Sequence, residues 1–208
     1  TIMFNFLRNK IYKIDKNGNK KRVFFIRGVH FSFKGKNSVV EIHEPLAKFD
    51  RCRIVCGNNC FVSIGSSPYR VKRLRVLTNG DNSSVKIGKD FSLTNTCEII
   101  TTPEKNLNVS IGDNCQFGLY ICIRATDGHK IISLEDGTVL NKGKDVVIGN
   151  HCWVASNVKI LKGSTIASGS VVGMSSVVAG KCDTPNSVYA GNPAKLKKTN
   201  ITWDRECP

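Results

Sequence analysis

The chain has 208 residues, with 31 lysines and arginines against 16 aspartates and glutamates, a formal charge of +15. This length can bury a sizeable core as one domain, and a content of 40% hydrophobic and 23% charged residues is typical of a folded protein. No apolar run reaches the roughly 20 residues of a membrane-spanning helix, and residues 1–21 lack the apolar core of a signal peptide. These features exclude collagen, coiled coils and membrane spans, and they predict a cytoplasmic protein.

The nine cysteines are predicted to be reduced thiols, because their number is odd and no secretory leader is recognised. No CxxC pair occurs, and the cluster of Cys52, Cys56 and Cys60 has no second Cys or His pair at zinc-finger spacing. We therefore expect neither a disulfide framework nor a metal site.

The first predicted unit is a cap over residues 1–36. Residues 11–15 and 20–26 flank Asn17-Gly18, a dipeptide that favours the positive backbone angles of a tight hairpin. We expect this unit to close the first coil of the following repeat and to shield its open edge.

Residues 37–189 contain a six-residue repeat of apolar anchors, which neither a helical nor a plain alternating period generates. Small residues often follow the anchors, as a tight corner requires, and compact side chains such as Cys97, Cys115 and Cys152 follow four positions after an anchor. Three six-residue units make one triangular turn of a parallel β-helix, so the fold class is all-β. The anchors are Ile87, Leu93, Ile99, Ile111, Phe117, Ile123, Ile148, Val154, Ile160, Ile166, Val172 and Val178.

The spacing of the coils reveals one long insertion. A regular coil takes 18 residues, as from Ile148 to Ile166, but Ile111 and Ile148 are 37 residues apart. The excess forms a predicted arm over residues 124–144, and long insertions in a compact solenoid are more often functional than accidental. Residues 190–208 are predicted to end the ladder with a turn and a basic tail.

The repeat resembles the left-handed β-helix acyltransferases, the hexapeptide-repeat family. The resemblance covers about residues 39–198 and is carried by Ile148-Gly-Asn-His-Cys-Trp-Val-Ala, Val158-Lys-Ile-Leu-Lys-Gly and Tyr189-Ala-Gly-Asn-Pro-Ala-Lys. The arm, from Thr126-Asp-Gly-His to Asn141, is similar to the loop of polysialic acid and capsular polysaccharide O-acetyltransferases, as is the tail Ile201-Thr-Trp-Asp-Arg. In departure from that pattern, Ser133 replaces an expected acidic residue, and Ala155 and Ala167 replace commoner glycines.

The resemblance implies a homotrimer, acetyl-coenzyme A in a groove between two subunits, and His129 as the base on the arm. Histidine suits the role because its ordinary pKa lies near working pH, whereas a sugar hydroxyl is a poor nucleophile without a base. Direct transfer with no acyl-enzyme is expected. Asp127 is the nearest carboxylate that could orient the ring, with Glu135, Asp136 or a backbone carbonyl as alternatives. Trp153 would donate its indole N–H or form a flat wall beside the thioester.

Coenzyme A carries phosphates, and lysines near the later coils are placed to pair with them, although lysines are often only solvated surface residues. Lys162, Lys197 and Lys198 are further cations in this half of the chain. The predicted coenzyme-binding residues are Trp153, Ala155, Gly173, Ser175, Lys181, Pro193 and Lys195.

The remaining positive charge is concentrated in residues 8–27 and 70–75. Such a field attracts an anionic polysaccharide, for example one that contains sialic acid, and would also favour peripheral contact with an anionic inner-membrane face. Simple solubility is the plain alternative, and nucleic acid is not expected, because no recognised binding motif accompanies the charge. Arg70, Arg73 and Trp203 are the predicted acceptor-binding residues, and a structural anchor for the tail is the alternative role of Trp203.

The sequence therefore predicts an acetyl-coenzyme A-dependent O-acetyltransferase acting on a sugar hydroxyl of a capsular or surface polysaccharide. One alternative is an N-acetyltransferase on an amino sugar or nucleotide sugar. A second is a non-catalytic glycan-binding β-helix. A third, a zinc hydratase resembling the γ-type carbonic anhydrases, is disfavoured because it needs three histidines around one metal and only His129 and His151 lie in the appropriate half.

Overall fold

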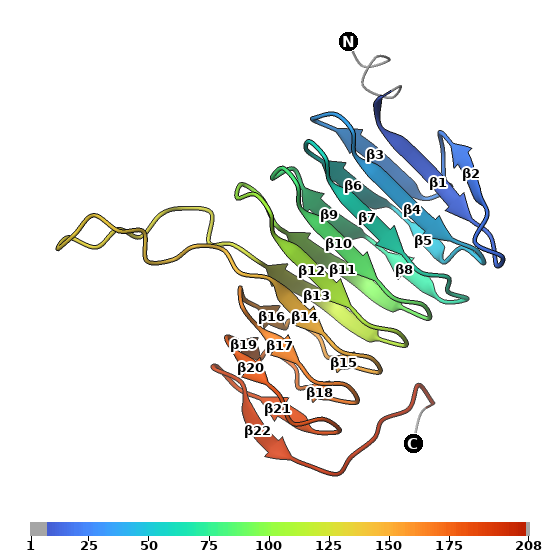
Figure 1. Ribbon diagram of the computed structural model, residues 1–208. Helices are drawn as coiled ribbons and strands as arrows, with labels where there is room; N and C mark the ends of the chain where they lie inside the picture. The colour runs from blue at the N-terminus through green and yellow to red at the C-terminus, as the bar shows by residue number, and fades with distance from the viewer. Residues whose placement is uncertain (1–7, 207–208) are drawn as a thin grey trace.

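A computed structural model describes residues 8–206, and it shows a left-handed parallel β-helix with a triangular cross-section (Figure 1). In the described part of the chain, no helix is long and apolar enough to cross a membrane. The eight cysteines described there carry free thiols.

The first face of the prism is one nearly parallel sheet. The hairpin predicted around Asn17-Gly18 is confirmed, since β2 pairs antiparallel with β1 and Gly18 has a φ of +83°. The strands in spatial order are β2 (Lys20–Val23), β1 (Lys10–Ile14), β4 (Val39–His43), β7 (Phe61–Ile64), β10 (Ser84–Ile87), β12 (Asn108–Ile111), β14 (Val146–Ile148), β17 (Thr165–Ile166) and β20 (Lys181–Cys182).

The other two faces share their longest strands, because β11 and β13 bend from one face to the next at Thr96 and Tyr120, whose φ values are +56° and +57°. The second face contains β5 (Lys48–Asp50), β8 (Arg70–Lys72), the first parts of β11 (Ser92–Ile100) and β13 (Gln116–Arg124), β15 (Trp153–Val154), β18 (Val171–Val172), β21 (Val188–Ala190) and the antiparallel β22 (Lys195–Lys198). The third contains β3 (Val29–Phe33), β6 (Cys52–Cys56), β9 (Leu74–Thr78), the second parts of β11 and β13, β16 (Lys159–Ile160) and β19 (Val177–Val178).

The apolar anchors stack in register inside the prism. Ile123, for example, lies between Ile99 and Ile160 in neighbouring coils, and all three side chains are fully buried. Adjacent strands lie about 4.8 Å apart, so each anchor contacts the anchors above and below it, and burying one such side chain contributes about 1.5–3 kcal/mol. Cys97, Cys115 and Cys152 are also inside the prism, as the repeat predicts.

The parallel coils begin earlier than the predicted boundary at residue 37. β1 pairs in parallel with β4, and β3 pairs in parallel with β6, so these two strands of the predicted cap already belong to the parallel coils. The third strand of the cap, β2, is antiparallel and covers the edge of β1. Residues 1–7 of the predicted cap lie outside the described residues.

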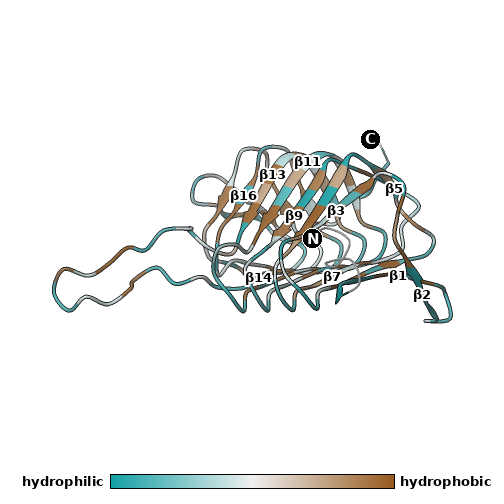
Figure 2. Cartoon of the chain, turned by 90° about the horizontal axis from the view of Figure 1, so that it is seen from above, coloured by the Kyte–Doolittle hydropathy of each residue, from teal (hydrophilic) through white to brown (hydrophobic). Residues whose placement is uncertain are grey.

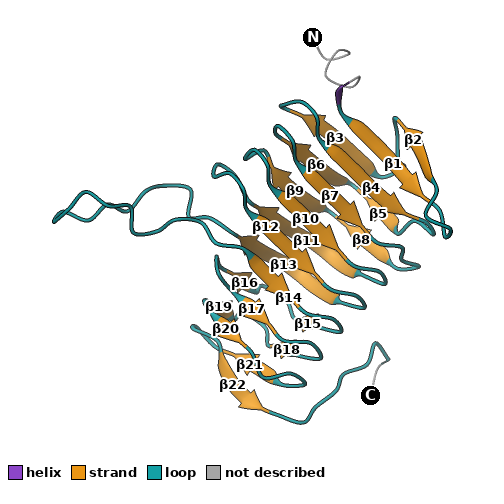
Figure 3. Cartoon of the chain, viewed as in Figure 1, coloured by secondary structure: helices purple, strands orange, loops and turns teal. Residues whose placement is uncertain are grey.

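The arm leaves the prism between β13 and β14 and projects away from it (Figures 1 and 2). It has no named strand, and an isolated bridge joins Ile132 and Val139 within it (Figure 3). Ile131, Ile132, Leu134 and Leu140 are all more than half exposed, and Leu134 is exposed completely. The arm therefore carries apolar side chains that the other residues between positions 8 and 206 do not cover.

Candidate active site

The root of the arm is organised around the side chain of Asn141. Its amide nitrogen donates to the Asp127 carboxylate (2.9 Å) and to the backbone carbonyl of His129 (2.8 Å). Its amide oxygen accepts from the backbone N–H of Ile131 (2.7 Å). One side chain thus binds the backbone at His129 and Ile131 and the side chain of Asp127, which precedes His129.

Lys162, in the loop after β16, ties this root to the next coil. Its ammonium group donates to the Asp127 carboxylate and to the backbone carbonyl of Asn141 (2.7 Å). The hydrogen bond from Lys162 holds the pKa of Asp127 below its ordinary value, and the hydrogen bond from Asn141 lowers it further. Asp127 is therefore a carboxylate at neutral pH, and its charge is already paired.

Glu104, in the loop after β11, holds the arm from the preceding coil. Its carboxylate accepts from the hydroxyl of Thr126 and from the backbone N–H of Gly143 (2.8 Å). The Thr126 hydroxyl in turn accepts from the N–H of Gly128 (3.1 Å). Both ends of the arm are therefore fixed to neighbouring coils by charged side chains.

His129 itself is exposed, and its ring makes no hydrogen bond with any other residue between positions 8 and 206. Asp127 is the predicted orienting partner; in the described chain its carboxylate binds Lys162 and Asn141, and its contact with the His129 ring stays a prediction. Of the alternatives, Asp136 binds Thr138 within the arm, through the backbone N–H (3.1 Å) and the hydroxyl (2.8 Å). Within one chain, the arm positions the backbone of His129 and leaves the ring free to contact other groups.

Trp153 lies on β15 of the second face, with 38% of its surface exposed. The arm leaves the prism on the side away from β15 (Figure 1). One chain therefore does not bring His129 and Trp153 together, although each is available at the surface.

The C-terminal tail folds back beside Trp153. The indole N–H of Trp203 donates to the backbone carbonyl of His151 (2.8 Å), and its ring stacks on the His151 ring with centroids 4.5 Å apart. Trp203 is only 8% exposed, which leaves little surface for the acceptor contact predicted for it. Its centroid lies 6.3 Å from that of Trp153, so we assign it an anchoring role for the tail.

Arg205 holds the end of the tail against three earlier coils. Its guanidinium also lies over the ring of Tyr69, 4.2 Å from the centroid. It donates to Ser92 Oγ (2.6 Å), Gln116 Oε1 (3.0 Å), Asn114 Oδ1 (3.1 Å) and the backbone carbonyls of Asp90 (2.9 Å) and Cys115 (3.3 Å). Sequence reasoning noted the tail but missed this anchor.

The predicted coenzyme-binding residues fall into two groups. Ala155 and Gly173 lie one above the other where the chain leaves the second face, and a Cβ on Gly173 would come within 3.1 Å of the Ala190 Cβ. Small residues therefore keep this corner narrow beside Trp153. Ser175 lies at the following corner, with a φ of +58° and its N–H bonded to the Ser156 carbonyl.

The second group lines a pocket of about 430 Å³ at the last coil, where Lys181, Pro193 and Lys195 come together. Two exposed lysines beside a proline and the apolar wall of Val178 and Ala179 fit a ligand with both anionic and apolar parts. The residues of this end of the prism are therefore compatible with coenzyme A.

Arg70 and Arg73 lie farther toward the N-terminus. Arg70 is exposed on β8 beside Lys48, and Arg73 is exposed at the following corner with a φ of +54°. On the second face, β8 and β15 are separated by β11 and β13, so Arg70 lies about 14 Å from the level of Trp153. These arginines can contact only a part of an acceptor that extends beyond the reacting sugar.

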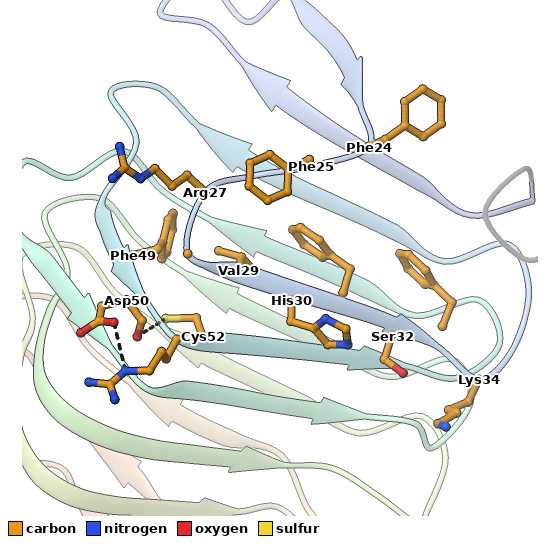
Figure 4. Close-up of a pocket in the computed structure, with 14 residues that line it drawn as sticks. Phe24, Phe25, Arg27, Val29, His30, Ser32, Lys34, Phe49, Asp50 and Cys52 are labelled. Carbon is orange, nitrogen blue, oxygen red and sulfur yellow. Dashed lines mark hydrogen bonds and ion pairs between the residues drawn. The ribbon is translucent and has the colours of Figure 1, made fainter. Parts of the chain in front are cut away.

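Another pocket, of about 1070 Å³, lies at the N-terminal end of the prism (Figure 4). Phe24, Phe25 and Phe49 line it together with Arg27 and His30. None of the predicted site residues lines this pocket, so its size does not mark the transfer site.

The triangular parallel β-helix with six-residue repeats and a histidine-bearing arm defines a hexapeptide-repeat acyltransferase. A relative from Neisseria meningitidis, a polysialic acid O-acetyltransferase, is 36% identical over 199 residues, which cover 86% of this chain and 92% of the relative. The chain belongs to the polysialic acid O-acetyltransferase family and is an acyltransferase.

Solved structures agree with this assignment. The polysialic acid-specific acetyltransferase NeuO is 28% identical, with a TM-score of 0.57 over 86% of this chain and 79% of its own. A galactoside acetyltransferase in complex with coenzyme A shares the fold at 24% identity, with a TM-score of 0.51 over 66% of this chain and 64% of its own. A scan against protein-family models finds no match.

Proposed function

We propose that the protein transfers an acetyl group from acetyl-coenzyme A to a hydroxyl of polysialic acid or a closely related anionic capsular polysaccharide. The observation that supports this most directly is the relationship to polysialic acid O-acetyltransferases over most of the chain. The charge of +15 favours an anionic acceptor polymer. Acetyl-coenzyme A is the proposed donor because Lys181 and Lys195 flank a pocket suited to its phosphates and apolar arm.

His129 is the proposed general base. Its ring accepts the proton of the acceptor hydroxyl as the hydroxyl oxygen attacks the thioester carbonyl. The new carbon–oxygen bond forms, the carbon–sulfur bond breaks, and the proton passes to the departing thiolate. Asn141 and Lys162 hold the backbone that carries His129, and such positioning of a reacting group lowers an activation barrier.

The proposed active unit is a homotrimer, in which the arm of one subunit reaches the groove beside Trp153 of its neighbour. Two features support this. The arm and β15 lie on different sides of one chain, and the apolar residues of the arm are exposed there. Packing the arm against a second subunit would bury Ile131, Ile132 and Leu134 and complete the site. Cytoplasmic location and contact with a membrane surface stay predictions from the sequence.

The first test is His129→Ala. We expect turnover of polysialic acid to fall by about a hundredfold or more, the usual range for loss of a general base, while acetyl-coenzyme A still binds. Transfer would be measured with labelled acetyl-coenzyme A, and binding by calorimetry. His30→Ala is the matched control, because His30 is also exposed but lies on β3, which β6, β9 and β11 separate from β13. Near-normal turnover in His129→Ala would remove the residue from the mechanism.

A further inference from the structure

Arg124 is a half-buried cation at the point where the arm begins. It is the last residue of β13, and its Nε atom is covered by the protein without a hydrogen-bond partner among residues 8–206. Within the same range, its guanidinium lies within 4.0 Å of no carboxylate, in contrast to Arg75, which pairs with Glu98 on the same face. A half-buried charge without a counter-ion is costly unless a ligand supplies one.

The charge of Arg124 helps to lower the pKa of Asp127, but neither neighbouring carboxylate pairs with its guanidinium within 4.0 Å in the described part of the chain. The Asp127 carboxylate is bound by Lys162 and Asn141, and the Glu104 carboxylate by Thr126 and Gly143. Both acids are thus committed to holding the arm. The positive charge of Arg124 remains available at the arm root.

The space beside Arg124 opens next to His129. Gly128, which precedes His129, has a φ of +86°, and a Cβ built on it would meet only the Nη2 of Arg124, at 3.4 Å. Any side chain at position 128 would be strained at that backbone angle and would cover this nitrogen. Because position 128 is glycine, no side chain there covers this nitrogen, and the proposed base is the next residue in the chain.

We propose that Arg124 binds a carboxylate of the anionic acceptor and thereby places the reacting sugar beside His129. The inference rests on the proposed function and adds the residue that selects an acidic sugar over a neutral one. Arginine suits this task because its planar guanidinium can donate two parallel hydrogen bonds to one carboxylate. Each sialic acid unit of polysialic acid carries one carboxylate, so every unit of the polymer offers the same contact.

The test compares acceptors with and without the carboxylate. Wild type, Arg124→Gln and Arg124→Lys would be assayed on polysialic acid and on the same polymer after its carboxylates are reduced to alcohols. We expect Arg124→Gln to raise the KM for polysialic acid by about tenfold or more, the loss typical of one charged hydrogen bond, with the KM for acetyl-coenzyme A unchanged. On the reduced polymer, wild type and Arg124→Gln should be equal. Arg124→Lys should recover part of the loss.

Arg53→Gln is the matched control, because it removes the same charge from an exposed arginine on β6, on the same face but three strands from β13. Equal losses for Arg53→Gln and Arg124→Gln, or equal losses on both polymers, would overturn the proposal. If thermal denaturation shows that Arg124→Gln is not folded, Arg124→Lys is compared with the wild type instead. An unchanged KM for polysialic acid in Arg124→Lys then overturns the proposal.

A binding measurement separates this proposal from the proposed function. Sialic acid oligomers would be titrated into His129→Ala and into the double variant His129→Ala/Arg124→Gln. Weaker binding to the double variant supports the Arg124 site, whether or not the wild type transfers acetyl groups to polysialic acid. A wild type that transfers no acetyl group to polysialic acid would contradict only the proposed function. Equal binding to the two variants overturns the Arg124 site even if transfer is observed.

Discussion

The prism and the arm are ordered by different physical means. Inside the prism, anchors such as Ile123 are fully buried between equivalent residues of adjacent coils. In the arm, Leu134 is fully exposed, and the order comes from hydrogen bonds of Asn141 and Lys162 at the root. The prism is therefore stabilised within one chain by apolar burial, whereas the arm is held by polar contacts and leaves its apolar side chains exposed.

The difference shows how the fold combines a stable frame with a positioned arm that carries the proposed base. Apolar stacking is non-directional, so the anchors can stack in the same way although the coils of the N-terminal half are longer than those of the C-terminal half. Hydrogen bonds fix direction, and those around His129 come from residues on both sides of the arm and from the next coil. Changes in the prism should therefore alter stability, and changes at the arm root should alter turnover.

The largest effect is expected in the prism. Ile123→Ala removes a fully buried side chain and should lower the free energy of unfolding by about 2–5 kcal/mol. Leu134→Ala is the control in the arm and should leave monomer stability unchanged, because that side chain is exposed. Denaturant unfolding of both variants measures the contrast. A similar loss in Leu134→Ala would show that the arm packs against the folded chain.

The next effect is expected at the arm root. Asn141→Ala removes the bonds to Asp127, to the His129 carbonyl and to the Ile131 N–H. Turnover should fall by about tenfold to a hundredfold, because small displacements of a reacting group cost that much, while the unfolding midpoint stays the same.

Asp136→Ala is the control for Asn141→Ala, since Asp136 makes comparable hydrogen bonds elsewhere in the arm. Steady-state kinetics with both substrates measures the effect. Equal turnover in Asn141→Ala and wild type would contradict a positioning role for Asn141.

The smallest effect concerns pH. Lys162 and Asn141 lower the pKa of Asp127 below its ordinary value of 3.8. The contact between Lys162 and Asp127 is therefore fully present at any pH above 3.8, and it is lost only as the pH falls through the lower pKa of Asp127 in the folded protein. Lys162→Met should raise the titration midpoint of Asp127 toward 3.8, whereas that of Asp136, lowered by Thr138 and Ser133, should not move. Carboxyl carbon shifts followed by NMR measure both groups. An unmoved Asp127 midpoint would show that Lys162 does not pair with it in solution.

Much of the prism is predictable from sequence, because every six-residue unit needs one buried apolar residue and one corner. Ile87, Ile111 and Ile148 are spaced unequally in the chain yet lie in register, as the inserted segments predict. The start of the coils is predicted too late because the Asn17-Gly18 hairpin conceals the parallel pairing of β1 with a strand 29 residues further on.

The site is only partly predictable. The position of His129 in the single long arm is visible in the sequence, but the partner of Asp127 is not, since Lys162 lies 35 residues away in the next coil. Asn141 stands within the arm motif, yet nothing local indicates that it bonds on both sides of His129. Contacts between coils depend on which corners face each other, and the spacing of anchors does not encode that.

The return of the tail to earlier coils alters how the solenoid should come apart. A stack in which each layer touches only its neighbours can fray progressively from its last layer. Arg205 in the C-terminal tail donates hydrogen bonds to Asp90 and Ser92, so the tail that follows the last coil is bound to a coil far from it along the axis. Unfolding of the final coils then requires that the hydrogen bonds of Arg205 break, and the C-terminal half should unfold as a single cooperative unit.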